Sequence, residues 1–220
     1  GVQGMVHISA TRDEPVADSS YKHIEAKGER AILQAMPDAV ILRPSVIFGP
    51  EDAFINRFAG MTRFSPVLPV VGADTKFQPV YVDDVAHAAA LAVEGKAEPG
   101  IYELGGPDVN TFRELMQQML GVIRRRRLIV NIPFRIAAIM AGAMEIGQTV
   151  SLGLVPPQIT TDQVRSLRVD NVVSEGARGF SDLGIKPTAS EAVLPDYLWR
   201  FRPGGQYDAI KESAKNLRSH

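Results

Sequence analysis

Residues 40–50 read VILRPSVIFGP, and this stretch decides the fold. It opens with three apolar residues and closes with a Gly-Pro pair that breaks regular structure, a pattern typical of a strand buried on both faces. Pro44 cannot donate a hydrogen bond to a neighbouring strand, so we expect the regular strand to end at about Arg43. The residues after Pro44 would then lie over the carboxyl edge of a sheet, which is where open α/β sheets bind ligands.

The composition is that of an ordinary globular protein. The chain has 220 residues, of which 45% are hydrophobic and 22% charged, and its net charge is −1. A net charge this close to zero argues against nucleic acid as the main partner. The absence of cysteine excludes disulfides, thiol catalysis and a zinc–thiolate site, and the four histidines have no metal-ligand spacing, so no metal site is expected.

The expected location is cytoplasmic. A chain without cysteine is compatible with a reducing compartment. The first ten residues, GVQGMVHISA, lack the basic region and the apolar region of a signal peptide. If the protein also touches a membrane, we expect it on the inner face.

Strand and helix signals alternate along the first half of the chain. Apolar runs predict further strands at residues 5–10, 77–82 and 100–106. Helical spacing predicts helices at residues 20–36, after Gly49-Pro50, at 85–95 and at 112–123. Asp83 or Asp84 is placed to cap the third of these helices, and the Pro- and Gly-containing residues 66–76 predict a loop. Such alternation is typical of parallel βαβ units.

The second half of the chain reads as mainly helical. The four arginines at 124–127 lead into a predicted strand, LIVNIP, and are either a solvated strand start or a contact for an anionic partner. The apolar segment 132–155 contains Pro133, Arg135, Glu145 and Gln148, so its uninterrupted runs fall short of the roughly 20 residues that span a bilayer. We expect a buried or pocket-lining helix there, with a peripheral membrane contact as the alternative.

A set of short motifs resembles one family in residue type and in order. The set comprises Ser9, Tyr21, Arg43-Pro44, the run FQPVYVDDVA at 77–86 and DLGI at 182–185. It resembles the extended and atypical short-chain dehydrogenases/reductases and the NAD-dependent epimerase/dehydratase-like proteins. The details FGPED, FINRF, RFSPVLP and YLWRFRP resemble one atypical branch, related to the NAD(P)H-binding accessory subunit of respiratory complex I.

The resemblance implies an α/β fold, namely the C-terminal part of a Rossmann-type doubly wound parallel sheet with a smaller, mainly helical C-terminal lobe. It implies that residues 1–123 belong to the NAD(P)-binding domain, 124–202 to a substrate or partner lobe and 203–220 to a loose tail. About the first third of a full-length protein is then expected to be missing. Three strands of the main sheet would remain, with an apolar edge that demands a protein partner or a second copy of the chain.

The resemblance also implies the site residues. Ser9 and Tyr21 match the catalytic serine and tyrosine of the family. Ser9, Tyr21, Pro44, Ser45 and Val46 would lie along the nicotinamide end of NAD(P). The sequence gives no basis for choosing between NAD and NADP, and none for naming a small-molecule substrate.

Two departures from the family pattern bear on the mechanism. Active members carry a lysine four residues after the tyrosine, where it lowers the pKa of the phenol, whereas this chain has Glu25. Lys27 lies six residues after Tyr21 and so points about 240° around the helix, too far to replace it. The second departure is the absence of a G-x-G-x-x-G or G-x-x-G-x-x-G loop, whose backbone N–H groups hold the pyrophosphate.

These departures predict a non-catalytic NAD(P)-binding protein, in which the nucleotide is structural and the surface docks on a larger assembly such as complex I. The alternative is an NAD(P)-dependent epimerase, dehydratase or reductase that acts on a sugar nucleotide. A third interpretation, a scaffold fragment that binds no nucleotide, follows from the missing glycine loop.

Overall fold

A three-stranded parallel sheet forms one part of the molecule. The computed structural model describes residues 4–10, 20–150, 160–205 and 207, excluding the side chains of residues 20–26 and 146–150. The strands β1 (Val6–Ile8), β2 (Val40–Pro44) and β7 (Gly100–Leu104) pair in the order β1-β2-β7. Both pairings are parallel, with β2 in the centre. This arrangement confirms the predicted Rossmann-type α/β class.

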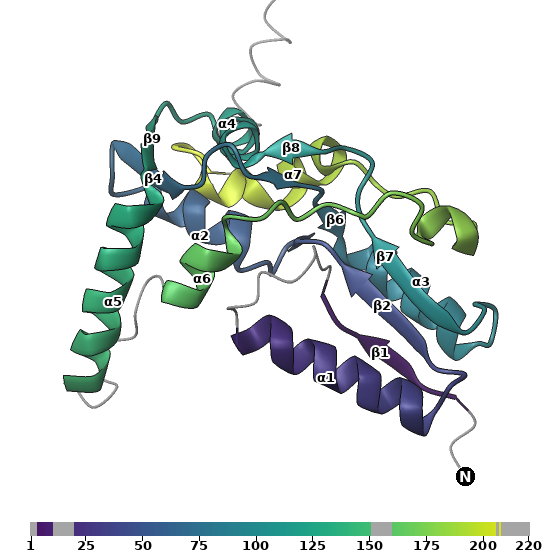
Figure 1. Ribbon diagram of the computed structural model, residues 1–220. Helices are drawn as coiled ribbons and strands as arrows, with labels where there is room; N and C mark the ends of the chain where they lie inside the picture. The colour runs from purple at the N-terminus through teal and green to yellow at the C-terminus, as the bar shows by residue number, and fades with distance from the viewer. Residues whose placement is uncertain (1–3, 11–19, 151–159, 206, 208–220) are drawn as a thin grey trace, which may run out of the picture.

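Helices cover both faces of this sheet (Figure 1). On one face, Val40 and Leu42 of β2 pack with Val85 and Ala88 of α3 (Val82–Val93) in a buried apolar cluster. Alternate residues of a strand point to opposite faces, so Arg43 points toward the other face, which α1 (Ser20–Ala35) covers. The sheet is therefore sandwiched between α1 and α3, as expected for a doubly wound fold.

The predicted end of β2 at Arg43 is one residue too early. Pro44 is part of the strand and lies opposite Leu104 of β7. The N–H of Ser9 donates to Leu42 O, and the N–H of Ser45 donates to Leu104 O. The backbone N–H and C=O groups of residues 42 and 44 therefore point toward β1, and those of residues 43 and 45 point toward β7. Pro44 tolerates its missing N–H because β1 ends at Ile8, before that position is reached.

A second core lies beside the sheet. Three short pairings frame it: β3 with β6, parallel; β4 with β9, parallel; and β5 with β8, antiparallel. The bounds are β3 Ile47–Phe48, α2 Phe54–Met61, β4 Val67–Val71, β5 Lys76–Phe77, β6 Val80–Tyr81, β8 Asn110–Thr111, α4 Phe112–Val122 and β9 Leu128–Ile132. Four aromatic rings pack together in it, with centroid separations of 5.3–5.8 Å between neighbouring rings, namely Phe54, Phe58, Phe77 and Phe112.

The C-terminal helices complete this second core. Leu194, Tyr197 and Leu198 of α7 (Ser190–Leu198) are buried against it. The remaining elements are α5 (Phe134–Val150), α6 (Thr161–Ser166) and the short 3₁₀ helices η1 (Phe180–Leu183) and η2 (Trp199–Phe201). The expected division of the chain at residue 123 stays a prediction, and most of the expected tail 203–220 falls outside the described residues.

Two further local predictions were wrong. Part of the predicted loop 66–76 is the strand β4. Pro69 is tolerated in it because the backbone groups of residues 66 and 68 point toward β9, whereas the backbone nitrogen of residue 69 points away from β9 and needs no acceptor there. Neither Asp83 nor Asp84 caps α3, whose N-cap is Tyr81. Thr111 caps α4 through a reciprocal capping box with Glu114.

The helix α5 stands at the outer end of the molecule, beside α6 (Figure 1). Its buried side, Ala137 and Ala141, packs with Val71 of β4 and Val164 of α6. The segment predicted as a helix from 132 to 155 is thus helical from Phe134 to Val150, and the helix has one buried side. Among all the residues that the structure describes, no helix has both the length and the apolar character needed to cross a bilayer.

Candidate functional site

The expected site residues lie at the carboxyl edge of the three-stranded sheet. Ser9 directly follows β1, Pro44 ends β2, and Ser45 and Val46 come next. Tyr21 lies in the first turn of α1, and its side chain is outside the description. The fold brings Ser9 and the Pro44–Val46 segment to one edge of the sheet because the neighbouring parallel strands β1 and β2 both end there. Their role as ligand contacts stays a prediction.

The polar groups that follow β2 are already engaged within the protein. Ser45 is buried, and its hydroxyl lies within hydrogen-bond reach of both oxygens of Asn171, 3.0 Å from the backbone oxygen. The N–H of Val46 donates to Asn171 Oδ1 over 2.9 Å. Asn171 therefore covers the end of β2. It bonds the Ser45 hydroxyl and the Val46 N–H, which belong to two residues that the family resemblance places beside the nucleotide.

A buried ionic triad is centred on Arg43, two residues before Ser45. Arg43 donates from Nε and an Nη atom to the two carboxylate oxygens of Glu29 in α1, over 3.1 and 2.7 Å. A second Nη atom lies 3.4 Å from Glu103 of β7. The hydrogen bond with Glu29 raises the pKa of Arg43 above its ordinary value, an effect opposed by burial. The triad ties α1 and β7 to the central strand.

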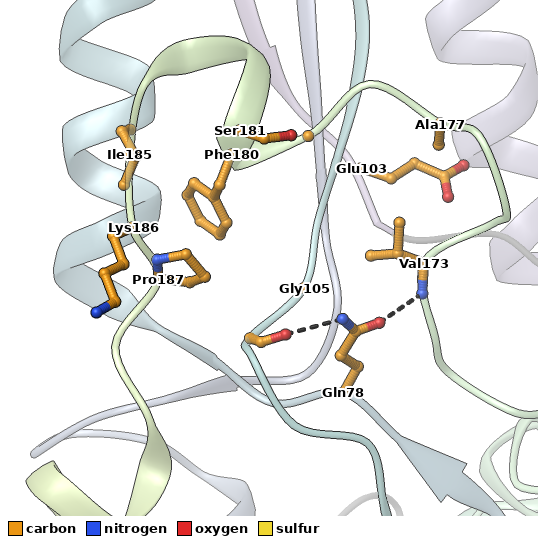
Figure 2. Close-up of a pocket in the computed structure, with 12 residues that line it drawn as sticks. Gln78, Glu103, Gly105, Val173, Ala177, Phe180, Ser181, Ile185, Lys186 and Pro187 are labelled. Atoms are coloured by element: carbon orange, nitrogen blue, oxygen red, sulfur yellow. Dashed lines mark hydrogen bonds between the residues drawn. The ribbon is translucent and has the colours of Figure 1, made fainter.

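A pocket of about 450 Å³ opens at the carboxyl end of β7. Gln78 bridges one wall: its Nε2 donates to Gly106 O over 2.8 Å, and its Oε1 accepts from the N–H of Val173 over 3.0 Å. The dashed lines of Figure 2 mark these two bonds, and Lys186 lies on the opposite wall beside Ile185 and Pro187. Glu103 also lines the pocket, with one oxygen held by the N–H of Ser174 at 2.8 Å.

The glycine pair in this pocket is explained by close packing. A Cβ on Gly106 would lie 1.9 Å from Pro79 O, and one on Gly105 would lie 2.5 Å from the Gln78 side chain. Both glycines are thus required by neighbouring protein atoms rather than by space for a phosphate. The pocket does not supply the phosphate cradle that the sequence lacks.

The FGPED motif, residues 48–52, forms a second polar tie. Asp52 accepts from the N–H groups of Ile55 and Asn56 at the start of α2, over 2.5 and 3.2 Å. Its other carboxylate oxygen accepts from the hydroxyl of Tyr197 in α7 over 2.9 Å. Burial and the nearby Asp52 charge raise the pKa of Tyr197 well above its ordinary value. This motif therefore fastens α7 to the turn after β3.

The acidic run at 83–84 has a similar role. The carboxylate of Asp84 accepts from the N–H and the hydroxyl of Thr188, over 2.6 and 3.1 Å. It holds the segment before α7 against α3. Among the described residues there is no cluster of histidine and acidic side chains suited to a metal ion.

Sequence reasoning missed Asn171 and the partners of Arg43. Gln78 lies in the FQPV run that the resemblance drew attention to, but no role was predicted for it. Asn171 carries no sequence signal that pairs it with Ser45, because 126 residues separate them. Glu29 could have been suspected, since a charged residue on the inner side of a helix needs a partner.

Comparison with known proteins identifies relatives of the chain. Residues 9–103 match the model of the 3-beta hydroxysteroid dehydrogenase/isomerase family. NADH dehydrogenase (ubiquinone) 1 alpha subcomplex subunit 9, mitochondrial, of Arabidopsis thaliana is 37% identical over 210 residues, covering 93% of this chain and 52% of that protein. Its Rattus norvegicus counterpart is 30% identical over 204 residues, covering 92% and 52%. The chain thus spans about half the length of these curated relatives.

Solved structures show the same fold. The crystal structure of dTDP-glucose 4,6-dehydratase from Bacillus anthracis, in complex with NAD, superposes with a TM-score of 0.61. The superposition covers 91% of this chain and 62% of that one, at 15% identity. At this identity, the likeness establishes the Rossmann-type fold and nothing about the reaction.

Proposed function

We propose that this chain, which is related to subunit 9 of the NADH dehydrogenase alpha subcomplex and has a fold of the short-chain dehydrogenase/reductase type, is a non-catalytic NAD(P)-binding protein. Its residues would form the nicotinamide-side wall of the nucleotide site. The nucleotide would be structural, and the folded chain would dock on a larger assembly such as respiratory complex I.

One observation carries the non-catalytic part of the proposal. Tyr21 and Glu25 both lie in α1, an unbroken helix from Ser20 to Ala35. Residues four apart in a helix are neighbours, so the place of the family's lysine is taken by a carboxylate. A negative charge beside a phenol raises its pKa, which opposes its use as a general base.

The residues at the sheet edge fit a nicotinamide nucleotide in part. Pro44 and Val46 offer apolar contact, whereas the Ser45 hydroxyl and the Val46 N–H are committed to Asn171. The family resemblance assigns further polar contacts to Ser9 and Tyr21. The phosphates have no glycine-rich loop within the 220 residues, so we expect weak binding by this chain alone. A bound nucleotide would contribute its binding free energy to the stability of the fold.

The partner proposed is a protein assembly. The Arabidopsis and rat relatives are named as subunits, and their names place them in mitochondria. The cytoplasmic location expected for this chain stays a prediction, as does a homo-oligomer formed through the edge of β1. β1 is an edge strand of the sheet, and Ile8 at its end is 53% exposed.

A thermal-melt titration tests nucleotide binding. The 220-residue chain is heated with increasing NADPH, NADH or adenosine diphosphate ribose. A saturable rise of the melting temperature is expected, which corresponds to about 2.7 kcal/mol at a hundred times the dissociation constant. The double substitution Ser9→Ala with Tyr21→Phe should remove most of the rise, and Tyr207→Phe, at an exposed position, should leave it unchanged.

Substitution of Glu25 tests whether the absence of the family's lysine weakens nucleotide binding. Glu25→Lys should increase the NADPH-dependent rise because the ammonium can contact the ribose, and Glu25→Gln is the matched control that removes only the negative charge. If a folded sample shows no shift with any nucleotide, the binding proposal fails and the scaffold interpretation stands. A reductase activity of the unsubstituted chain that Tyr21→Phe abolishes would favour the enzyme alternative.

A further inference from the structure

Six large apolar side chains are exposed at the outer end of the molecule. They comprise one residue of the loop before β4, two of β9 and three of α5. Their exposed fractions are 93% for Phe64, 66% for Leu128, 39% for Val130, 51% for Ile136, 74% for Ile139 and 40% for Met140. We call this set the outer apolar face.

Hydrogen bonds from the Arg127 side chain and from the backbone join the segment before β4 to the start of β9. The Arg127 guanidinium donates to Thr62 O over 3.0 and 2.7 Å, and the N–H of Leu128 donates to Pro66 O over 3.1 Å. The loop that carries Phe64 is thereby fastened to the start of β9. Leu128 and Val130 point to one side of β9 because they alternate along the strand. The helix α5 begins two residues after β9 ends.

The stripe on α5 faces away from the core. Ile136, Ile139 and Met140 have the i, i+3, i+4 spacing of one helix face. The residues packed on β4 and α6 are Ala137 and Ala141, which lie on another side of the helix. An apolar stripe that the fold does not bury is unusual for a solvated helix.

The charged residues in the segment from just before β9 through most of α5 are all arginines. Residues 124–144 contain five arginines and no aspartate or glutamate. Two of the five have structural roles, since Arg127 is bonded to Thr62 and Arg125 Nε donates to Phe201 O over 2.8 Å. Arg126 and Arg135 are exposed, and neither has an ion pair or side-chain hydrogen bond within the described part of the chain.

We propose that the outer apolar face binds the surface of a bilayer that contains anionic lipid. Apolar side chains flanked by arginines can enter the headgroup region while the guanidinium groups meet lipid phosphates. The core of a protein–protein interface, in contrast, is depleted of charged residues. The helix α5 lies on the bilayer in this arrangement and does not cross it. The proposal concerns a different face from the nucleotide site and does not rest on nucleotide binding.

Vesicle flotation tests the proposal. The 220-residue chain, without nucleotide, is floated with vesicles of one part phosphatidylglycerol to three parts phosphatidylcholine, and with pure phosphatidylcholine vesicles. Binding to the anionic vesicles is expected, and the double substitution Ile139→Ser with Met140→Ser should weaken it at least tenfold. Val93→Ser is the matched control, because Val93 is an apolar residue of α3 that is 76% exposed. Arg126→Gln and Arg135→Gln should each weaken binding about fivefold, and less at high salt.

Three outcomes would overturn the proposal. The first is that the unsubstituted chain floats with neither kind of vesicle. The second is that Val93→Ser reduces binding as much as the α5 substitutions, which would indicate unspecific adsorption. The third is capture of an acidic protein by the same face, with no vesicle binding, which would assign the face to a protein partner. Circular dichroism of each variant confirms that it is folded.

Discussion

The carboxyl end of the sheet and the outer apolar face use the same kinds of residue in opposite ways. At the sheet, Arg43 is buried between Glu29 and Glu103, with side-chain exposures of 16%, 3% and 8%. On the outer face, Arg126 and Arg135 are in solvent beside exposed apolar side chains. The first region satisfies its charges internally, and the second leaves both charge and apolar surface unsatisfied.

This difference separates what holds the chain together from what remains for a partner. Polar groups that are fully bonded inside the protein stabilise one arrangement of the elements around them. Exposed apolar groups contribute little to the stability of the isolated chain, so a set of them indicates a surface that binds a partner. The comparison predicts large stability effects at the first region and almost none at the second.

The largest effect is expected for Arg43→Met. The substitution leaves Glu29 and Glu103 buried without their shared cation, which should cost about 3–5 kcal/mol of unfolding free energy. Urea denaturation measures it. The matched control is Lys96→Met, which breaks an ion pair with Glu94 whose side chains are 65% and 54% exposed, and which should have little effect on the unfolding free energy. Equal effects at the two positions would contradict the structural role of the triad.

A smaller effect is expected for Tyr197→Phe. The substitution removes a hydrogen bond to the Asp52 carboxylate and should cost about 1.5–3 kcal/mol at neutral pH. The pKa of Tyr197 is higher in the folded state than in the unfolded state, where it is about 10. The stabilisation is therefore complete below pH ~10 and is lost as the pH rises further.

Urea denaturation between pH 7 and pH 10.5 measures the difference between the unsubstituted chain and the Tyr197→Phe variant. The difference should narrow at the alkaline end. Tyr207→Phe serves as the control, because Tyr207 is 63% exposed. A difference that widens with rising pH would show that the sign of the pKa change is wrong.

The smallest effect is expected for Ile139→Ser. Ile139 is 74% exposed, so its loss should change the unfolding free energy by no more than about 0.5 kcal/mol. Ala141→Ser, on the buried side of the same helix, places a hydroxyl where Ala141 has no exposure and should cost about 1–3 kcal/mol. If the two variants were equally destabilised, Ile139 would be part of the core and the outer face would not be available to a partner.

The general fold could be predicted because its signals are local. Apolar runs, breakers and helical spacing each involve a few adjacent residues, and they identified the three strands of the sheet and the helices between them. Two of the errors, in β2 and β4, occurred at prolines. Pro44 and Pro69 both lie within strands. Each is tolerated because its backbone nitrogen, which carries no hydrogen, points to a side where no strand is paired at that position. Whether a strand is paired on one side or on both cannot be read from a single stretch of sequence.

The site was harder to predict because its contacts are distant in sequence. The position of Ser9 and of Pro44–Val46 at one edge followed from strand order. The closure of that edge by Asn171 depends on a segment 126 residues away from Ser45. The resemblance gave residue roles in relatives that this chain matches only in part, and no residue pattern indicated that Ser45 and Val46 would be engaged by another side chain.

The parallel pairings also have a consequence for how the chain acquires its structure. Val40 pairs with Gly100 and Val67 pairs with Leu128, so the two ladders join residues 60 and 61 positions apart. Sheets built on such non-local contacts fold slowly compared with helical bundles. On the ribosome, Glu29 and β2 emerge well before β7 with Glu103. Until then an apolar strand edge is open, and this interval is when the nascent chain is most exposed to aggregation.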